Sequence, residues 1–145
     1  MNPANSKLPN NSKLKDIPIH SLSGDDYSVG SIRALLAEIA ARLENLVQTG
    51  ESGMIDLNSL PFAQGEYEQL RQTLGQGEVS VRIEAIGASE IIETRYPGVW
   101  WVTHFNVEGD IVADMLEIAS IPEIIKSQPA DVRAGLAGLQ DKLNE

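Results

Sequence analysis

The 145-residue chain contains no cysteine. Disulfide bonds, thiolate zinc sites, iron–sulfur ligation by the chain's own thiols and cysteine nucleophiles are therefore excluded. Histidine is nearly as scarce, since only His20 and His104 occur and they lie far apart in the sequence. A metal centre built on two histidines is not expected, and we predict neither a bound metal nor a cofactor.

Long apolar runs are also missing, because no stretch approaches the roughly 18 residues of a membrane-spanning helix. The first 20 residues contain Lys7, Lys13 and Lys15, but no apolar stretch follows them as it would in a secretory signal. The sequence therefore predicts a cytoplasmic protein that does not insert into a membrane.

Basic residues are few: 11 Lys and Arg stand against 21 Asp and Glu, for a net charge of −10. Nucleic acids are bound through clustered Lys and Arg, so this balance argues against them as partners. Residues 24–145 hold 8 basic and 20 acidic residues. Such an acidic body would attract a basic peptide, mainly by faster encounter. Alternatively, the charge serves only solubility.

The length fits one domain preceded by a tail. Residues 1–28 are rich in Asn, Ser, Lys and Pro and are predicted to form a flexible arm, which could dock on the body through residues 17–19. Residues 29–145 form the predicted domain. From Val29 to Val47, apolar residues recur at steps of three and four, which predicts a helix capped by Ser28 or Ser31 and ended by Gly50.

The rest of the chain alternates between helical and extended patterns. A second helix is predicted over 61–74, ended by Gly75, and a third after Pro129, with Val132, Leu136, Leu139 and Leu143 on one face. Strands are predicted over 79–85, 91–96, 99–107 and 111–118, with a turn at 87–89. Their short connections favour an antiparallel meander of four strands. Residues 54–57 are either a brief strand or an extended connector. The fold class is therefore α+β, with helices packed mainly on one face of the sheet.

Two patterns suggest chemistry but have simpler interpretations. Gly75-Gln76-Gly77 followed by Ser80 resembles a phosphate-binding loop, yet here a helix runs into a strand, so a helix cap and turn fits better. His104 has no obvious serine partner in the sequence. We expect it to be a partly buried or surface histidine and not a general base.

Carboxylates offer two further candidate clusters. Asp110, Asp114 and Glu117 form one, and Glu90 with Glu93 the other. Such groups bind divalent cations or act as acid and base, but in an acidic chain they are commonly solvated faces. Asp114 fits the solvated interpretation less well, because its strand face also carries apolar residues, namely Val112, Leu116 and Ile118.

The Trp100-Trp101 pair is the most informative feature, because adjacent strand residues point to opposite faces. Trp101 shares the more apolar face with Val99 and is assigned to the helix-covered core. Trp100 then lies on the other face beside Val102 and His104. There it is either an anchor for another chain or is covered by the arm, by a loop or by a second copy.

Three segments together resemble the C-terminal region of the HupH and HyaF hydrogenase expression proteins, over roughly residues 30–140. The central one is the most specific, and the other two occur in the expected order. They are Leu74-Gly75-Gln76-Gly77-Glu78-Val79, Ile91-x-Glu93-Thr94-x-x-Pro97-Gly98-Val99-Trp100-Trp101-Val102, and Leu116-Glu117-Ile118 with Ile121-Pro122. The chain is shorter than many members of that family.

The resemblance implies an accessory role, without enzymatic activity, in the maturation of membrane-bound uptake nickel–iron hydrogenases. The implied partners are a hydrogenase subunit precursor, with the small iron–sulfur subunit favoured, and other maturation proteins. The family-matching positions are implied to form the partner surface and its scaffold, with Trp100 as contact and Trp101 as core; they are Glu93, Arg95, Pro97, Gly98, Trp100, Trp101 and Glu117.

Two rival functions from other classes are also open. One is a homodimeric structural module that pairs through the open sheet face or an edge strand. The other is a small carboxylate- or cation-dependent hydrolase built on Asp110, Asp114 and Glu117.

Overall fold

The computed structural model describes residues 24–145, so the predicted arm lies outside the described residues except for its last five positions. Those five are helical, because helix α1 spans Gly24–Thr49. The predicted caps Ser28 and Ser31 were therefore wrong, since both lie within the helix. The predicted end is confirmed: Gly50 adopts a positive φ of 75°, and its N–H donates to Leu46 O at 2.9 Å.

The sheet has five antiparallel strands, not the four predicted, in the order β1-β5-β4-β3-β2. The four predicted strands form the meander β2 to β5. Residues 54–57, for which the sequence allowed either a strand or a connector, contribute to the fifth strand, β1, which pairs with β5. The turn predicted at 87–89 was wrong, because those residues belong to β3 and the chain reverses around Ile86. The strands are β1 (Gly53–Asp56), β2 (Ser80–Ala85), β3 (Gly87–Glu93), β4 (Val99–Phe105) and β5 (Ile111–Ile118).

Between β1 and β2 the chain forms a short 3-10 turn, η3 (Leu57–Ser59), and then helix α2 (Glu66–Leu74). The helix begins five residues later than predicted, because Gly65 occupies its N-cap with a positive φ of 86°. Gly75 ends it as expected, and its N–H donates to Arg71 O at 2.9 Å.

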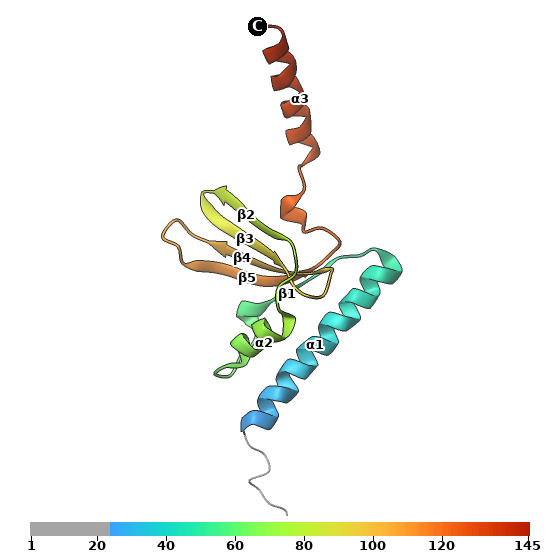
Figure 1. Cartoon of the computed structure of the whole chain (residues 1–145), viewed down its shortest axis with the longest axis vertical. Helices are drawn as coiled ribbons and strands as arrows, with labels where there is room; N and C mark the ends of the chain where they lie inside the picture. Colours follow the sequence, from blue (N-terminus) through green and yellow to red (C-terminus); the bar gives the residue numbers. More distant parts are fainter. Residues whose placement is uncertain (1–23) are drawn as a thin grey trace, which may run out of the picture.

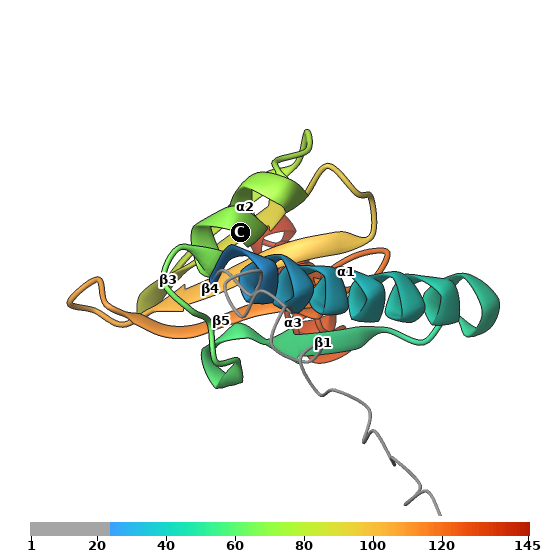
Figure 2. The same ribbon diagram turned by 90° about the horizontal axis from the view of Figure 1, so that it is seen from below.

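Helices α1 and α2 cover the same face of the sheet, which we call the helix-covered face (Figure 1). Figure 2 shows the two helices against the strands from below. Complete burial of one aliphatic side chain stabilises the fold by about 1.5–3 kcal/mol, so the cluster between these layers is the main source of stability. Its buried members are Ile32, Leu35, Ile39, Ile55, Leu57, Leu70, Leu74, Val99, Trp101, Leu116 and Ile118.

The opposite side of the sheet, here called the second face, carries a smaller apolar cluster. Ile91, Trp100 and Val102 are buried there, and Val81, Ile83, Met115 and Ile125 are half-buried against them. A 3-10 turn, η4 (Glu123–Ile125), lies over one end of this face. The two tryptophans therefore lie on opposite faces, as the strand period predicted.

The last helix, α3 (Pro129–Leu143), does not pack on the helix-covered face. All of its residues are exposed, and Figure 1 shows it extending away from the sheet. The predicted packing of helices mainly on one face therefore applies to α1 and α2 but not to α3. No helix within residues 24–145 has the length and hydrophobicity needed to cross a membrane.

Candidate functional site

The three segments that carry the family resemblance meet at one end of the sheet, which we call the motif end. The first and second are joined by backbone hydrogen bonds from Gly77 N to Glu93 O at 2.7 Å and from Arg95 N to Leu74 O at 2.9 Å. The second and third are joined by strand pairing, since Trp100 lies opposite Glu117. Three segments spread over residues 74–122 therefore form one structural unit.

On the second face, Glu93, Trp100 and Glu117 form a row across β3, β4 and β5. Both carboxylates accept hydrogen bonds from the backbone of nearby loops. Glu93 Oε2 accepts from Glu78 N at 3.3 Å, and Glu117 Oε2 accepts from Glu123 N at 3.1 Å. These side chains therefore hold the loops that flank the tryptophan.

Trp100 is covered by a loop of its own chain, which is one of the alternatives that the sequence left open. Its side chain is only 7% exposed, and its Nε1 donates to Ala119 O at 3.0 Å. Ile125 packs against the same cluster. The expected direct contact between the indole and a partner does not match this conformation, because the 119–125 segment occupies the place where a partner would sit.

The turn between β3 and β4 is built on Pro97 and Gly98. Val99 N donates to Tyr96 O at 3.0 Å, and Gly98 has a φ of 94°, the geometry of a type II turn with Pro and Gly at its central positions. Gly98 O also accepts from Ala119 N at 3.0 Å. This turn therefore ties the Trp100 strand to the loop that covers it.

Arg95 and the glycine segment fit closely together. A side chain at Gly75 would place its Cβ 2.5 Å from Arg95 Nε, and one at Gly77 would lie 2.6 Å from Thr94 O. The N–H groups of both glycines are already hydrogen-bonded within the chain. The segment is therefore a helix cap and turn, and not a phosphate-binding loop.

On the helix-covered face, Asp114 lies at the centre of a buried hydrogen-bond network that includes Trp101. Asp114 is 3% exposed and accepts hydrogen bonds from Trp101 Nε1 at 2.7 Å, Thr103 Oγ1 at 2.9 Å and Tyr67 Oη at 2.5 Å. Burial and the hydrogen bond to Asp114 raise the pKa of Tyr67 above its ordinary value, so the phenol stays protonated as a donor. The Arg71 guanidinium carbon lies 4.6 Å from the centre of the Trp101 ring.

The structure separates the two predicted carboxylate clusters. Asp114 lies on the helix-covered face, Glu117 on the second face and Asp110 in an exposed turn. Glu90 and Glu93 also lie on opposite faces, and Glu90 pairs with Arg82 at 2.9 Å. Among residues 24–145, no three His, Asp or Glu side chains are placed to hold a metal ion together.

His104 has a partner, Ser89, that is not apparent from the sequence. Ser89 Oγ lies 2.6 Å from His104 Nδ1, because the β3–β4 register places the two residues opposite each other. The signal available in the sequence was the Pro97-Gly98 turn. When the residues of β3 and β4 are paired outward from that turn, Ser89 and His104 lie opposite each other on the second face.

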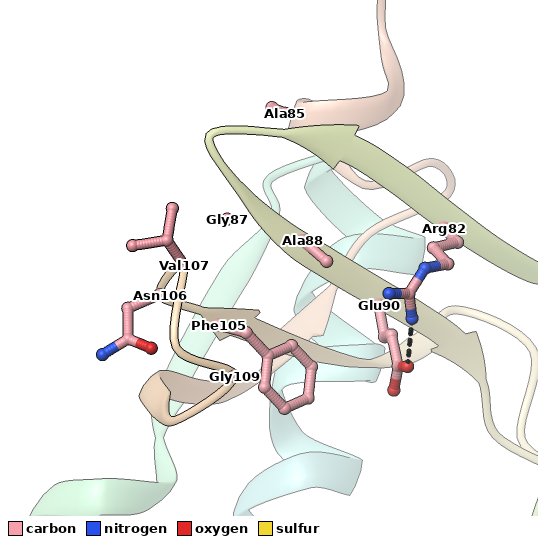
Figure 3. Close-up of a pocket in the computed structure, with 9 residues that line it drawn as sticks. All are labelled: Arg82, Ala85, Gly87, Ala88, Glu90, Phe105, Asn106, Val107 and Gly109. Atoms are coloured by element: carbon pink, nitrogen blue, oxygen red, sulfur yellow. Dashed lines mark hydrogen bonds and ion pairs between the residues drawn. The ribbon is translucent and has the colours of Figure 1, made fainter.

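A hollow of about 470 Å³ lies at the opposite end of the sheet, near the β2–β3 and β4–β5 hairpin ends (Figure 3). The Arg82–Glu90 ion pair forms one of its walls, and Phe105 contributes an aromatic ring. None of the family-matching positions lines it. The candidate functional site is therefore the motif end and not this hollow.

Comparison with known proteins finds both similar sequences and a similar solved structure. Residues 29–145 match the family model described as "HupH hydrogenase expression protein, C-terminal conserved region". Among solved structures, the hydrogenase expression protein HupH from Thiobacillus denitrificans ATCC 25259 is similar. It has 45% sequence identity and a TM-score of 0.76, with 79% of this chain and 96% of that chain covered.

Longer relatives match over part of their length. The hydrogenase expression/formation protein HupQ of Azotobacter chroococcum mcd 1 is 33% identical over 112 residues, which cover 77% of this chain and 39% of that protein. HupH of Rhizobium leguminosarum bv. viciae is 32% identical over 105 residues, which cover 71% of this chain and 36% of that protein. The matched region thus spans less than half the length of these relatives.

Proposed function

This chain belongs to the HupH hydrogenase expression protein family, and we propose that it is a non-enzymatic accessory protein in the maturation of an uptake nickel–iron hydrogenase. In this proposal the described domain binds a hydrogenase subunit precursor in the cytoplasm. It contributes shape and negative charge, and it transforms no substrate.

The observation that carries the proposal is what the family-matching side chains contact. Glu93 and Glu117 accept backbone N–H groups, Trp100 donates to a backbone carbonyl, and Pro97 with Gly98 forms a turn. These side chains shape a surface and do not converge on a reacting centre. A protein that acts by binding needs a surface of defined shape and no reacting centre.

The small iron–sulfur subunit is the favoured client. Its twin-arginine leader is basic, and residues 24–145 carry 12 more acidic than basic residues. Opposite charges accelerate encounter and orient the approach of two chains. Binding of the leader before export therefore suits an acidic domain, and other maturation proteins would join the same complex.

The proposed contact surface is the outer side of the motif end. Three large side chains are substantially exposed there: Tyr96 at 46%, Ile121 at 53% and Ile124 at 44%. Trp100 supports this surface from beneath, and its truncation would loosen the loop above it. Arg95 lies in the adjoining loop and is exposed as well.

A pull-down with the small-subunit precursor tests this surface. We expect the double variant Ile121→Ser/Ile124→Ser to lose at least about tenfold in apparent affinity, since interface energy is concentrated in a few large side chains. The matched control is Val107→Ser/Val112→Ser, because these residues are 73% and 58% exposed at the opposite end of the domain. Equal capture by the wild type and the Ile121/Ile124 variant would overturn the assignment.

A further inference from the structure

Helix α3 exposes an apolar stripe that no part of residues 24–145 covers. Val132, Leu136, Leu139 and Leu143 follow one another at steps of four, three and four residues, and they are 58%, 58%, 62% and 77% exposed. An isolated helix of 15 residues is marginal in water even when alanine-rich, and this one also contains two glycines, Gly135 and Gly138. The helix therefore needs a packing partner.

The second face of the sheet also carries apolar side chains that are not fully covered, and its width is similar to the length of the stripe on α3. Val81 and Ile83 on β2 and Met115 on β5 are only half-buried, and η4 covers only the end of this face at Trp100. The distance from β2 to β5 is three strand spacings, or about 14 Å. The stripe from Val132 to Leu143 extends about 16 Å along its helix, so the two surfaces agree in length.

The linker directs α3 away from the sheet of its own chain. Lys126 and Gln128 both have extended backbone conformations, with ψ angles of 130° and 147°. Gln128 precedes Pro129, and a residue before proline is kept out of the helical region by steric clash. A tight reversal at Gln128 is therefore disfavoured, and the helix extends away as Figure 1 shows.

Charge also favours the second face as the surface on which α3 packs. Arg133 flanks the apolar stripe on one side by helical periodicity, whereas Lys142, on the other side, pairs with Glu145. Arg133 forms no ion pair within residues 24–145. The second face carries Asp56, which is exposed and lies opposite Met115, and the half-buried Glu93. The guanidinium of Arg133 beside the stripe therefore complements the carboxylates of this face.

We propose that two copies of this chain exchange α3, so that the stripe of each packs on the second face of the other's sheet. A two-fold axis makes the exchange reciprocal, as in other domain-swapped dimers. The arrangement buries eight large aliphatic side chains of the two α3 helices and covers both second faces. It requires no hydrogenase subunit, so it can be tested independently of the proposed function.

Light scattering coupled to size exclusion measures the mass of the full chain. We expect twice the 15.7 kDa of one copy. The variant Leu136→Asp/Leu139→Asp should be monomeric, whereas Ala134→Asp/Ala137→Asp, on the opposite face of α3, should remain dimeric. Circular dichroism verifies that the sheet persists in each variant. A monomeric wild type at about 100 μM would overturn the proposal.

Cross-linking identifies what α3 contacts, and the absence of native cysteine makes engineered thiols unambiguous. We expect a mixture of Ile83→Cys and Leu139→Cys chains to form a disulfide-linked heterodimer under mild oxidation. A mixture of Val47→Cys and Leu139→Cys, with the thiol exposed on α1 on the other side of the sheet, should not. Exclusive linkage between two Leu139→Cys chains would indicate helix–helix pairing instead. Linkage within monomers of the Ile83→Cys/Leu139→Cys double variant would indicate docking on the same chain, and either result would refute the exchange.

Discussion

Trp101 Nε1 lies 2.7 Å from Asp114 Oδ1, so a buried indole and a buried carboxylate on neighbouring strands fix each other's position. The carboxylate receives two further donors, from Thr103 and Tyr67. Every buried side-chain polar atom among the described residues has a partner. The network therefore joins α2 to the centre of the sheet without an unpaired buried group.

The first prediction concerns Trp101. Trp101→Ala should lower the free energy of unfolding by about 3–5 kcal/mol, because it leaves a cavity between α2 and the sheet. Trp101→Phe keeps most of the apolar surface but removes part of the ring and the donor to Asp114, so its cost should be about 1–3 kcal/mol. Urea denaturation followed by circular dichroism measures both values. A cost below about 1 kcal/mol for the alanine variant would contradict the assignment of Trp101 to the core.

The second prediction concerns Asp114. Asp114→Ala should cost about 3 kcal/mol or more, since it leaves the buried donors of Trp101 and Thr103 unpaired. Asp114→Asn retains one acceptor oxygen and should cost less than the alanine variant. The matched control is Asp110→Ala, which removes an exposed carboxylate from the same hairpin and should change stability by less than about 0.5 kcal/mol.

The third prediction concerns pH. Burial and Asp114 raise the pKa of Tyr67, so in the unfolded chain this phenol loses its proton first, at about pH 10. Above that pH the folded state retains a proton that the unfolded state has lost, and stability falls as pH rises. Tyr67→Phe does not titrate. The stability difference between wild type and Tyr67→Phe, measured in urea, should therefore be constant below pH 9 and shrink above pH 10.

The fourth prediction compares two glycines with similar backbone geometry. Gly87 and Gly109 have φ angles of 81° and 90°, so alanine at either position costs about 1–2 kcal/mol in backbone strain. A Cβ at Gly87 would also lie 2.2 Å from Phe105 O, whereas one at Gly109 would meet nothing within 4 Å. Gly87→Ala should therefore cost about 1–3 kcal/mol more than Gly109→Ala in urea denaturation. Equal losses would show that the hairpin adjusts freely.

The sequence predicted those features that depend on local periodicity. Strand alternation assigned Trp100 and Trp101 to opposite faces, and the spacing of apolar residues located all three helices. The sequence does not distinguish strand β1 from an extended connector, because only Ile55 is buried among its four residues and one residue shows no alternating pattern. Its partner, β5, is also remote in the sequence.

Features that depend on the path of the chain in space could not be predicted. The cover over Trp100 comes from residues 119–125, whose course after β5 has no periodic signal. The stripe on α3 predicted a helix correctly, but amphipathicity does not say which surface an apolar stripe packs against. The Ser89–His104 contact required the strand register, which the sequence analysis did not assign.

The pairing of β1 with β5 has a consequence for folding kinetics. Gly53 pairs with Ile118, 65 positions along the chain, whereas β2 to β5 are joined by short hairpins. Closing a long loop costs entropy before its contacts form, so local hairpins assemble first. We therefore expect the transition state to contain the β2–β5 meander, with β1 and the amino-terminal helix docking onto it afterwards, and Ile55→Val to speed unfolding more than it slows folding.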